Sequence, residues 1–190
     1  MAYYLNLFSP ETYEAFKKSS QDVSGFRKRQ ENAARQIKKG DRLICYMTKL
    51  SRWFGVFVVE SDYFIDETPI FYPDSDPFKV RFKVKPLILL PVEKAIPIRE
   101  DYMWNKLTFT RGLDKKGSSW TGKLRNSLNR LEDEDGMFIE EQLRKQERNG
   151  NITDFEGIIN PTFLPKNKLE RIIVEPTDPR GEPLPEQLLA

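Results

Sequence analysis

Three apolar runs in the middle of the chain constrain the fold most, because each has the composition of a β-strand. Two of them, residues 42–49 and 53–60, are rich in branched and aromatic side chains and are separated by a short polar turn. The third, 78–90, begins with strict alternation of apolar and basic residues: Phe78, Val80, Phe82 and Val84 against Lys79, Arg81, Lys83 and Lys85. This pattern predicts a strand with one buried face and one hydrated, positively charged face.

Helices are expected on either side of these strands. A short strand over 3–7 leads to Ser9, a good N-cap, and Pro10, which suits the first helical position. A second helix is predicted over 25–39, followed by Gly40 in the usual C-terminal position. A third is predicted over 132–148, and 169–174 has the composition of a last strand.

The length and the C-terminal composition predict one domain followed by a tail. Residues 1–174 fit a single globular domain, whereas 175–190 is a proline-rich, acidic tail or linker of the kind that joins modules of longer proteins. No apolar stretch is long enough to span a membrane, and no basic-then-apolar segment begins the chain. The cytoplasm is therefore the expected location, with no membrane partner. The single cysteine, Cys45, lies in an apolar run and is expected to be a buried thiol.

Missing residue types exclude most catalytic chemistry. The chain contains no histidine and one cysteine, which removes imidazole bases, Ser-His and Cys-His nucleophiles and the usual zinc sites. Neither a glycine-rich phosphate loop nor a dinucleotide fingerprint is present. We expect no metal, no cofactor and no enzyme activity. Catalysis by Asp and Glu carboxylates is the chemistry that the composition leaves open.

The net charge of +2 conceals an uneven distribution. Residues 26–52 hold nine Lys and Arg against two acids, and 111–130 hold six against one. Acids concentrate at 132–135 and in the C-terminal tail. Separated basic blocks are typical of a surface that faces a polyanion, although a solvated helix face without a partner would also produce them.

Several separated motifs together resemble an EVE domain over residues 2–143. They are Tyr4-Leu5-Asn6 with Ser9-Pro10-Glu11, Gly40-Asp41-Arg42-Leu43, Trp53-Phe54-Gly55-Val56-Phe57 and Asp66-Glu67-Thr68-Pro69-Ile70. Leu107-Thr108-Phe109-Thr110, Trp120, Arg125-Asn126-Ser127-Leu128 and Glu132-Asp133-Glu134-Asp135 are similar to the closing part of that family.

The resemblance implies an α+β fold of the PUA-like superfamily, related to YTH domains: a small β-barrel flanked by helices, with an open pocket near the N-terminal strand-to-helix junction. Relatives of this kind bind methyladenine in RNA or methylated and hydroxymethylated cytosine in DNA. In prokaryotes they are often recognition modules of modification-dependent restriction systems. Phe26 stands about where YTH relatives carry a cage tryptophan.

Physical chemistry independently indicates which side chains suit a flipped base. Aromatic rings repay part of the cost of unstacking a base, and short polar groups read its edge. The predicted pocket consists of Asn6, Ser9, Phe26, Trp53, Phe71, Tyr72, Thr110 and Trp120. Asn6, Ser9, Phe71, Tyr72 and Trp120 are expected to line one concave site open to solvent. Since Trp53 and Phe54 adjoin in a strand, only one of them is expected to face inward.

Basic side chains around the rim would hold phosphates and fix the register. The predicted phosphate contacts are Arg27, Arg35, Lys38, Arg111, Lys123 and Arg125. The preferred function is a non-catalytic module that reads a flipped modified base, with DNA favoured over RNA, fused to or associated with a nuclease or motor module. One alternative is a protein-interaction domain with a basic surface. The other is a hydrolase using Asp66 and Glu67, disfavoured because adjacent strand residues point to opposite faces.

Overall fold

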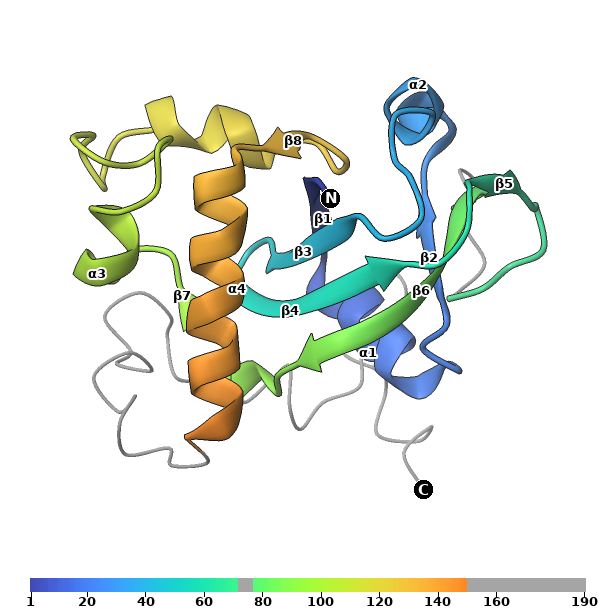
Figure 1. The fold of residues 1–190 in the computed structure, drawn as a ribbon, viewed down its shortest axis with the longest axis horizontal. Helices are drawn as coiled ribbons and strands as arrows, with labels where there is room; N and C mark the ends of the chain where they lie inside the picture. The colour runs from blue at the N-terminus through green and yellow to red at the C-terminus, as the bar shows by residue number, and fades with distance from the viewer. Residues whose placement is uncertain (72–76, 150–190) are drawn as a thin grey trace, which may run out of the picture.

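A curled mixed sheet, a half-barrel, forms the centre of the computed structural model, which describes residues 1–71 and 77–149 (Figure 1). Its strands are β1 (Tyr3–Phe8), β2 (Val23–Phe26), β3 (Arg42–Met47), β4 (Arg52–Val59), β5 (Phe64–Ile65), β6 (Val80–Leu89), β7 (Ile96–Pro97) and β8 (Arg130–Leu131). The order is β2-β6-β4-β3-β1-β8, with β5 also on β6 and β7 also on β4. The β1–β3 pair is parallel and the other pairs are antiparallel. The three predicted mid-chain strands are confirmed as β3, β4 and β6.

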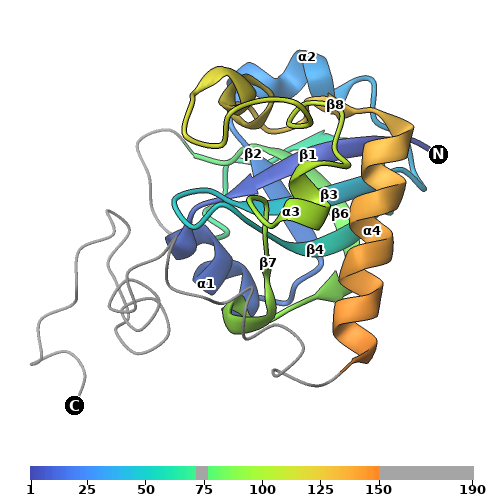
Figure 2. The same ribbon diagram turned by 90° about the vertical axis from the view of Figure 1, so that its left-hand side faces the viewer.

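Helices cover both faces of this sheet. The α-helices are α1 (Pro10–Lys18), α2 (Glu31–Ala34), α3 (Asp101–Trp104) and α4 (Asp133–Arg148), and 3-10 helices span Lys28–Gln30, Val92–Lys94 and Ser119–Leu124. Figures 1 and 2 show α4 on one side of the sheet and α1 on the other. None of the helices within 1–71 and 77–149 is long and apolar enough to cross a membrane.

Local sequence signals place α1 and α4 where they were predicted. The Ser9 hydroxyl accepts a hydrogen bond from the Thr12 amide at 3.1 Å, which is the N-cap contact that starts α1. Helix α4 begins at Asp133 and carries the expected Glu141–Lys145 ion pair at 2.9 Å. Both predictions are confirmed, because capping and i,i+4 pairing depend only on neighbouring residues.

Alternation along the strands divides the buried side chains into two cores. We call the first the α1-side core; it contains Phe8, Tyr13, Phe16, Phe26, Phe54, Phe57 and Phe82. We call the second the α4-side core; it contains Tyr3, Leu5, Tyr46, Trp53, Trp104, Trp120, Ile139 and Leu143. Because both faces of β4 are covered, Trp53 and Phe54 are both fully buried, on opposite faces. The expectation that only one of them faces inward is therefore wrong.

The predicted helix over 25–39 is also wrong in its first part. Residues 23–26 form β2, which pairs antiparallel with β6 from Val23↔Lys83 to Phe26↔Val80. Glycine is a poor helix residue, and the pairing both satisfies the backbone and buries the Phe26 ring. The helical structure that follows is short, comprising a 3-10 turn and α2.

The hydrated basic face expected for β6 holds for Lys83 and Lys85 but not for Arg81, which is 2% exposed. Strands β2 and β5 flank this end of β6, and the loop that follows β5 covers Arg81. Its Nε donates to the Phe78 carbonyl at 2.9 Å, and its Nη2 donates to the Thr68 carbonyl.

The predicted boundary at 174, the strand over 169–174 and the tail over 175–190 lie outside the described residues.

Candidate nucleic-acid interface

The sheet separates the predicted pocket residues into two groups. On β1, Tyr4 and Phe8 belong to the α1-side core, so Asn6 between them points to the same face. Phe26 lies in this core and Phe71 packs against it. Trp53 and Trp120 belong to the α4-side core. The prediction of a single concave site that includes Trp120 is therefore wrong.

The three residues on the α4 side have structural partners. The Trp53 ring meets Tyr46 with centroids 4.7 Å apart. The Thr110 hydroxyl donates to the Trp104 carbonyl at 2.7 Å. The Trp120 ring packs edge-on against Trp104 at 5.1 Å, and its Nε1 donates to the Gly117 carbonyl at 2.8 Å. Helix α3 and the loop that follows it cover this face, which explains why these side chains are buried.

On the α1 side, the polar centre of the candidate site is a buried amide–hydroxyl pair. Asn6 Nδ2 donates to Ser24 Oγ at 3.0 Å, and the two residues are 2% and 1% exposed. This is the one hydrogen bond that the Asn6 side chain makes within 1–71 and 77–149. A carboxamide offers two donors and a carbonyl oxygen with two lone pairs. Within these residues the Asn6 oxygen accepts no hydrogen bond, so it can still accept one from a ligand.

Aromatic rings adjoin this pair, because Ser24 is paired with Phe82 on β6 and lies two residues from Phe26 on β2. Phe26 meets Phe82 at 6.1 Å, and Phe71 meets both Phe16 at 6.4 Å and Phe78 at 5.5 Å. The guanidinium of Arg27 lies 3.9 Å from the centroid of the Phe78 ring. Phe71 and Phe78 are only partly buried, so the ring series ends at the surface beside a cation. Ser9 lies at the α1 N-terminus and is partly exposed, and Tyr72 lies outside the described residues.

Arg81 and Gly25 hold the Phe71 segment against β2. Arg81 bonds the Thr68 carbonyl and lies 3.3 Å from the Asp66 carboxylate. A Cβ on Gly25 would come within 2.7 Å of Ile70 Cδ1 and 2.9 Å of Phe78 Cβ, so only glycine allows this approach. The backbone amide of Thr68, its hydroxyl and Arg81 together lower the pKa of Asp66.

The first basic block is only partly available to a ligand. Arg35 and Lys38 are exposed, whereas Arg52 is buried in β4 and Arg42 lies 3.7 Å from Glu140. Burial lowers the pKa of Arg52 to about 10, with the charge of Glu100 opposing the shift. The charge count of residues 26–52 therefore overstates the basic surface, which is formed by exposed side chains that precede and follow α2.

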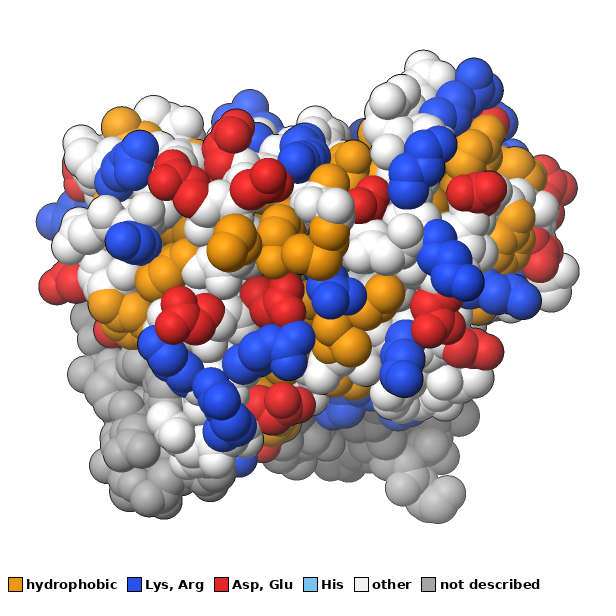
Figure 3. Space-filling view, in the orientation of Figure 1, with side chains coloured by type: hydrophobic (Ala, Val, Ile, Leu, Met, Phe, Trp, Pro, Cys, Tyr) orange, Lys and Arg blue, Asp and Glu red, His pale blue; other side chains and the backbone are white. Residues whose placement is uncertain are grey.

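The second basic block lies near the Ser119–Leu124 turn. Arg125 is exposed and lies 3.4 Å from the Thr121 hydroxyl, Lys123 is partly buried, and Arg111 is exposed, 3.8 Å from Glu134. Figures 1 and 2 place this turn and α2 at the same end of the molecule. Across the α4 face, acidic and basic side chains alternate, whereas basic ones gather over α2 (Figure 3).

Sequence reasoning missed three residues of this region: Ser24, Tyr63 and Arg81. Ser24 was assigned to no element, and only the pairing of β2 with β6 turns it toward Asn6. Arg81 belongs to the alternating basic residues of 78–85, so its side chain was predicted to be exposed, whereas it is buried. Tyr63 lies between polar residues and the short apolar pair Phe64-Ile65 and was assigned to no element, yet its hydroxyl donates to Glu31 at 3.2 Å.

The two carboxylates of the hydrolase hypothesis do not come together in the part of the chain that the structure describes. Asp66 faces Thr68 and Arg81, while Glu67 is exposed and pairs with Lys79 at 3.3 Å, so the two acids of the hydrolase hypothesis have separate partners. No group of three or more acidic, His or Cys side chains fit for a metal occurs within 1–71 and 77–149. Cys45 is fully buried, which raises the pKa of its thiol.

The curled half-barrel with helices on both faces defines an α+β domain of the PUA-like class, as expected from the sequence. The family model for the EVE domain matches residues 2–142, and the chain belongs to this family.

Known proteins and structures are similar to this chain over most of its length. A UPF0310 protein of Pyrococcus abyssi is 26% identical over 154 residues, which cover 75% of this chain and 100% of that protein. The crystal structure of human THYN1 protein in complex with 5-methylcytosine-containing DNA is 17% identical with a TM-score of 0.51, covering 77% of this chain and 98% of that one. The Pho92 YTH domain in complex with m6A is 13% identical with a TM-score of 0.54, covering 75% and 83%. At these identities the two structures show a shared fold.

Proposed function

We propose that this protein binds nucleic acid, DNA in preference to RNA, and reads one modified base with Asn6. The observation that carries the proposal is the Asn6 carboxamide, which is 2% exposed and makes one hydrogen bond, to Ser24, among the described residues. Buried polar groups in folded proteins normally have their bonding capacity satisfied. An amide that keeps an unused oxygen at the edge of an aromatic core is suited to a ligand with complementary donors.

The edge of cytosine or adenine supplies the matching pattern. Each has an exocyclic amino group beside a ring nitrogen, so the Asn6 oxygen would accept from the amino group while an amide N–H donates to the ring. Phe71, which packs against the α1-side core and is partly buried, is the ring expected to stack on the flipped base. A methyl or hydroxymethyl substituent would lie against Phe26 and neighbouring rings.

The relatives support a nucleic acid with a modified base as the class of ligand, and the preference for DNA remains our proposal. The human THYN1 structure contains DNA with 5-methylcytosine and matches almost the whole of that chain, whereas the Pho92 structure contains m6A. Methylated or hydroxymethylated cytosine and methyladenine are therefore the bases to test. The exposed side chains of Arg35 and Lys38, which follow α2, would contact the phosphates on either side of the flipped base. Association with a nuclease or motor module remains part of the proposal.

The experiment compares binding of short DNA and RNA oligonucleotides that differ in one modified base. Asn6→Leu should reduce the ratio of affinities for modified and plain oligonucleotides more than it reduces overall affinity. Thr110→Val is the matched control, because it removes a buried hydrogen-bonding hydroxyl on the other face of the sheet. If Asn6→Leu preserves the ratio, Asn6 does not read the base. If the parent protein does not distinguish modified from plain oligonucleotides, the proposed function is wrong.

A further inference from the structure

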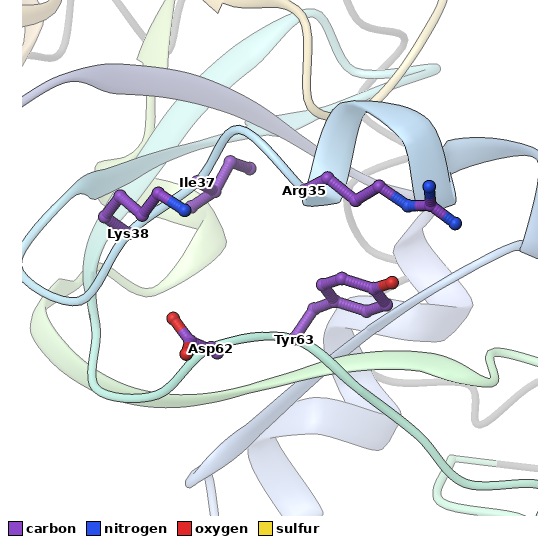
Figure 4. A pocket seen from close by; sticks show the side chains of 5 residues that line it. All are labelled: Arg35, Ile37, Lys38, Asp62 and Tyr63. Carbon is purple, nitrogen blue, oxygen red and sulfur yellow. The ribbon is translucent and has the colours of Figure 1, made fainter.

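A hollow of about 200 Å³ lies between residues 35–38, which follow α2, and the segment that precedes β5 (Figure 4). Arg35, Ile37 and Lys38 line one side, and Asp62 and Tyr63 line the other. Arg35, Lys38 and Asp62 are exposed, whereas Ile37 is buried and Tyr63 is partly buried. The hollow thus combines an apolar floor, one aromatic ring and two cations.

This hollow adjoins the candidate base site through the chain itself. Strands β2 and β5 lie on opposite sides of β6, at residues 80–83 and 80–81 respectively. The segment from Arg27 through α2 crosses from the end of β2 to Tyr63, where Glu31 accepts the Tyr63 hydroxyl at 3.2 Å. Ile37 at the floor belongs to the same α1-side core as Phe26. A nucleic-acid strand that places one base near Phe26 would therefore have its next nucleotide near Tyr63.

We propose that the hollow binds the nucleotide that flanks the read base, an inference that rests on the proposed function. The flanking base stacks on the Tyr63 ring, and its phosphate lies between Arg35 and Lys38. Stacking on one aromatic ring tolerates every base, so this subsite contributes affinity and register without sequence preference. Asp62 repels phosphate, which fixes the polarity of the nucleotide: phosphate toward α2 and base toward Tyr63.

Glu31 is an internal competitor for the same cations. Its carboxylate lies 3.6 Å from Arg35 Nη2 and also pairs with Lys28. Hydrogen bonds from Lys28 and then from Tyr63 lower the pKa of Glu31, so it is ionised at neutral pH. A phosphate entering the hollow competes with this carboxylate for Arg35. Glu31→Gln should therefore strengthen nucleic-acid binding, because glutamine can still accept the Tyr63 hydroxyl while releasing the two cations.

The test measures binding of the full chain to single-stranded DNA that carries one modified base, at several salt concentrations. Tyr63→Ala should weaken binding about 5- to 140-fold, and by the same factor for modified and plain strands. Tyr63→Phe keeps the ring and should bind much as the parent does. Arg35→Gln and Lys38→Gln should each lower the slope of log affinity against log salt by about 0.7. Lys145→Gln, on α4, is the matched control and should leave the slope unchanged.

The outcomes separate this inference from the proposed function. If the parent reads the modified base and a folded Tyr63→Ala variant binds as tightly as the parent, the flanking subsite is wrong while the base site stands. Should Tyr63→Ala fail to fold, the Arg35 and Lys38 variants decide, because both side chains are exposed. Unchanged salt slopes in both, or weaker binding by Glu31→Gln, would overturn the subsite. If the parent does not distinguish the modified base from the plain one, the proposed function is wrong, and the flanking subsite, which rests on it, is wrong as well.

Discussion

Substituting Gly136 by alanine should destabilise the protein, although glycine-to-alanine changes inside helices usually stabilise. Gly136 lies in α4 and is buried against β1. An alanine Cβ at this position would lie within 2.6 Å of three atoms of Tyr3, namely Cβ, Cγ and Cδ2. A rotation of the Tyr3 ring cannot relieve the contact, because Tyr3 Cβ is attached directly to the β1 backbone. Helix α4 would have to move away from the sheet.

The magnitude follows from two opposing terms. Alanine gains about 1 kcal/mol over glycine in a helix interior. Overpacking of a close-packed core typically costs 1–3 kcal/mol, and a contact with a fixed backbone neighbour belongs at the upper end, about 3 kcal/mol. The net loss is therefore about 2 kcal/mol, which corresponds to a fall in Tm of about 4–8 °C for a domain of this size.

Urea denaturation of Gly136→Ala and Gly122→Ala side by side provides the assay. Nothing lies within 4 Å of an alanine Cβ at Gly122, so that variant should change stability by less than about 0.5 kcal/mol. The midpoint for Gly136→Ala should fall while the slope stays constant. A Gly136→Ala protein as stable as the parent would show that α4 does not pack on Tyr3 in the way described.

Three further predictions concern stability. Trp120→Ala should lower the free energy of unfolding by about 3–5 kcal/mol in a denaturant titration, because the ring is buried against Trp104. A loss below about 1 kcal/mol, as for an exposed pocket wall, would contradict the buried position of Trp120. Asp135→Ala should lower the free energy of unfolding by about 1–3 kcal/mol, since the Asp135 carboxylate accepts hydrogen bonds from the Thr108 amide at 2.8 Å and hydroxyl at 2.5 Å. Equal melting temperatures of parent and variant would show that these hydrogen bonds do not stabilise the fold. The pKa of Glu31 is lowered in the folded state, so its contribution is present above its ordinary value of 4.5 and disappears as the pH falls through the folded pKa. Glu31→Gln should accordingly flatten the acid limb of a stability–pH profile, and an unchanged limb would contradict this linkage.

The four longest strands (β1, β3, β4 and β6) and the two longest helices could be predicted because their signals are local. Alternation identified β6, the Ser9-Pro10 pair identified the start of α1, and periodicity identified α4. Strand β2 could not be found in this way, because its four residues are strand only through pairing with β6. Arg81 was misplaced for the same reason: the alternation is correct, but β5 and its loop cover the face that the pattern marks as hydrated.

The candidate site shows a similar division. Asn6 could be chosen from the sequence, since a small polar residue at a strand end beside a capped helix is suited to base recognition. Its partner Ser24 could not, because the contact depends on the curl that brings β2 beneath β1. Trp120 was chosen because its sequence neighbours are polar. Those neighbours do not predict the contact with Trp104 of α3, which buries the ring.

Measurements of stability can distinguish a functional role of Asn6 and Ser24 from a structural one. Burying an amide without full hydrogen bonding costs roughly 1–3 kcal/mol, and replacing both members of a buried polar pair with apolar groups of similar shape is nearly neutral or stabilising. The double variant Asn6→Leu/Ser24→Ala should therefore be at least as stable as the parent in thermal melts while losing its preference for the modified base. A structural role for the pair predicts the opposite, namely a clear loss of stability. If the double variant melts several degrees below the parent and still discriminates, the pair belongs to the fold and the base must be read elsewhere.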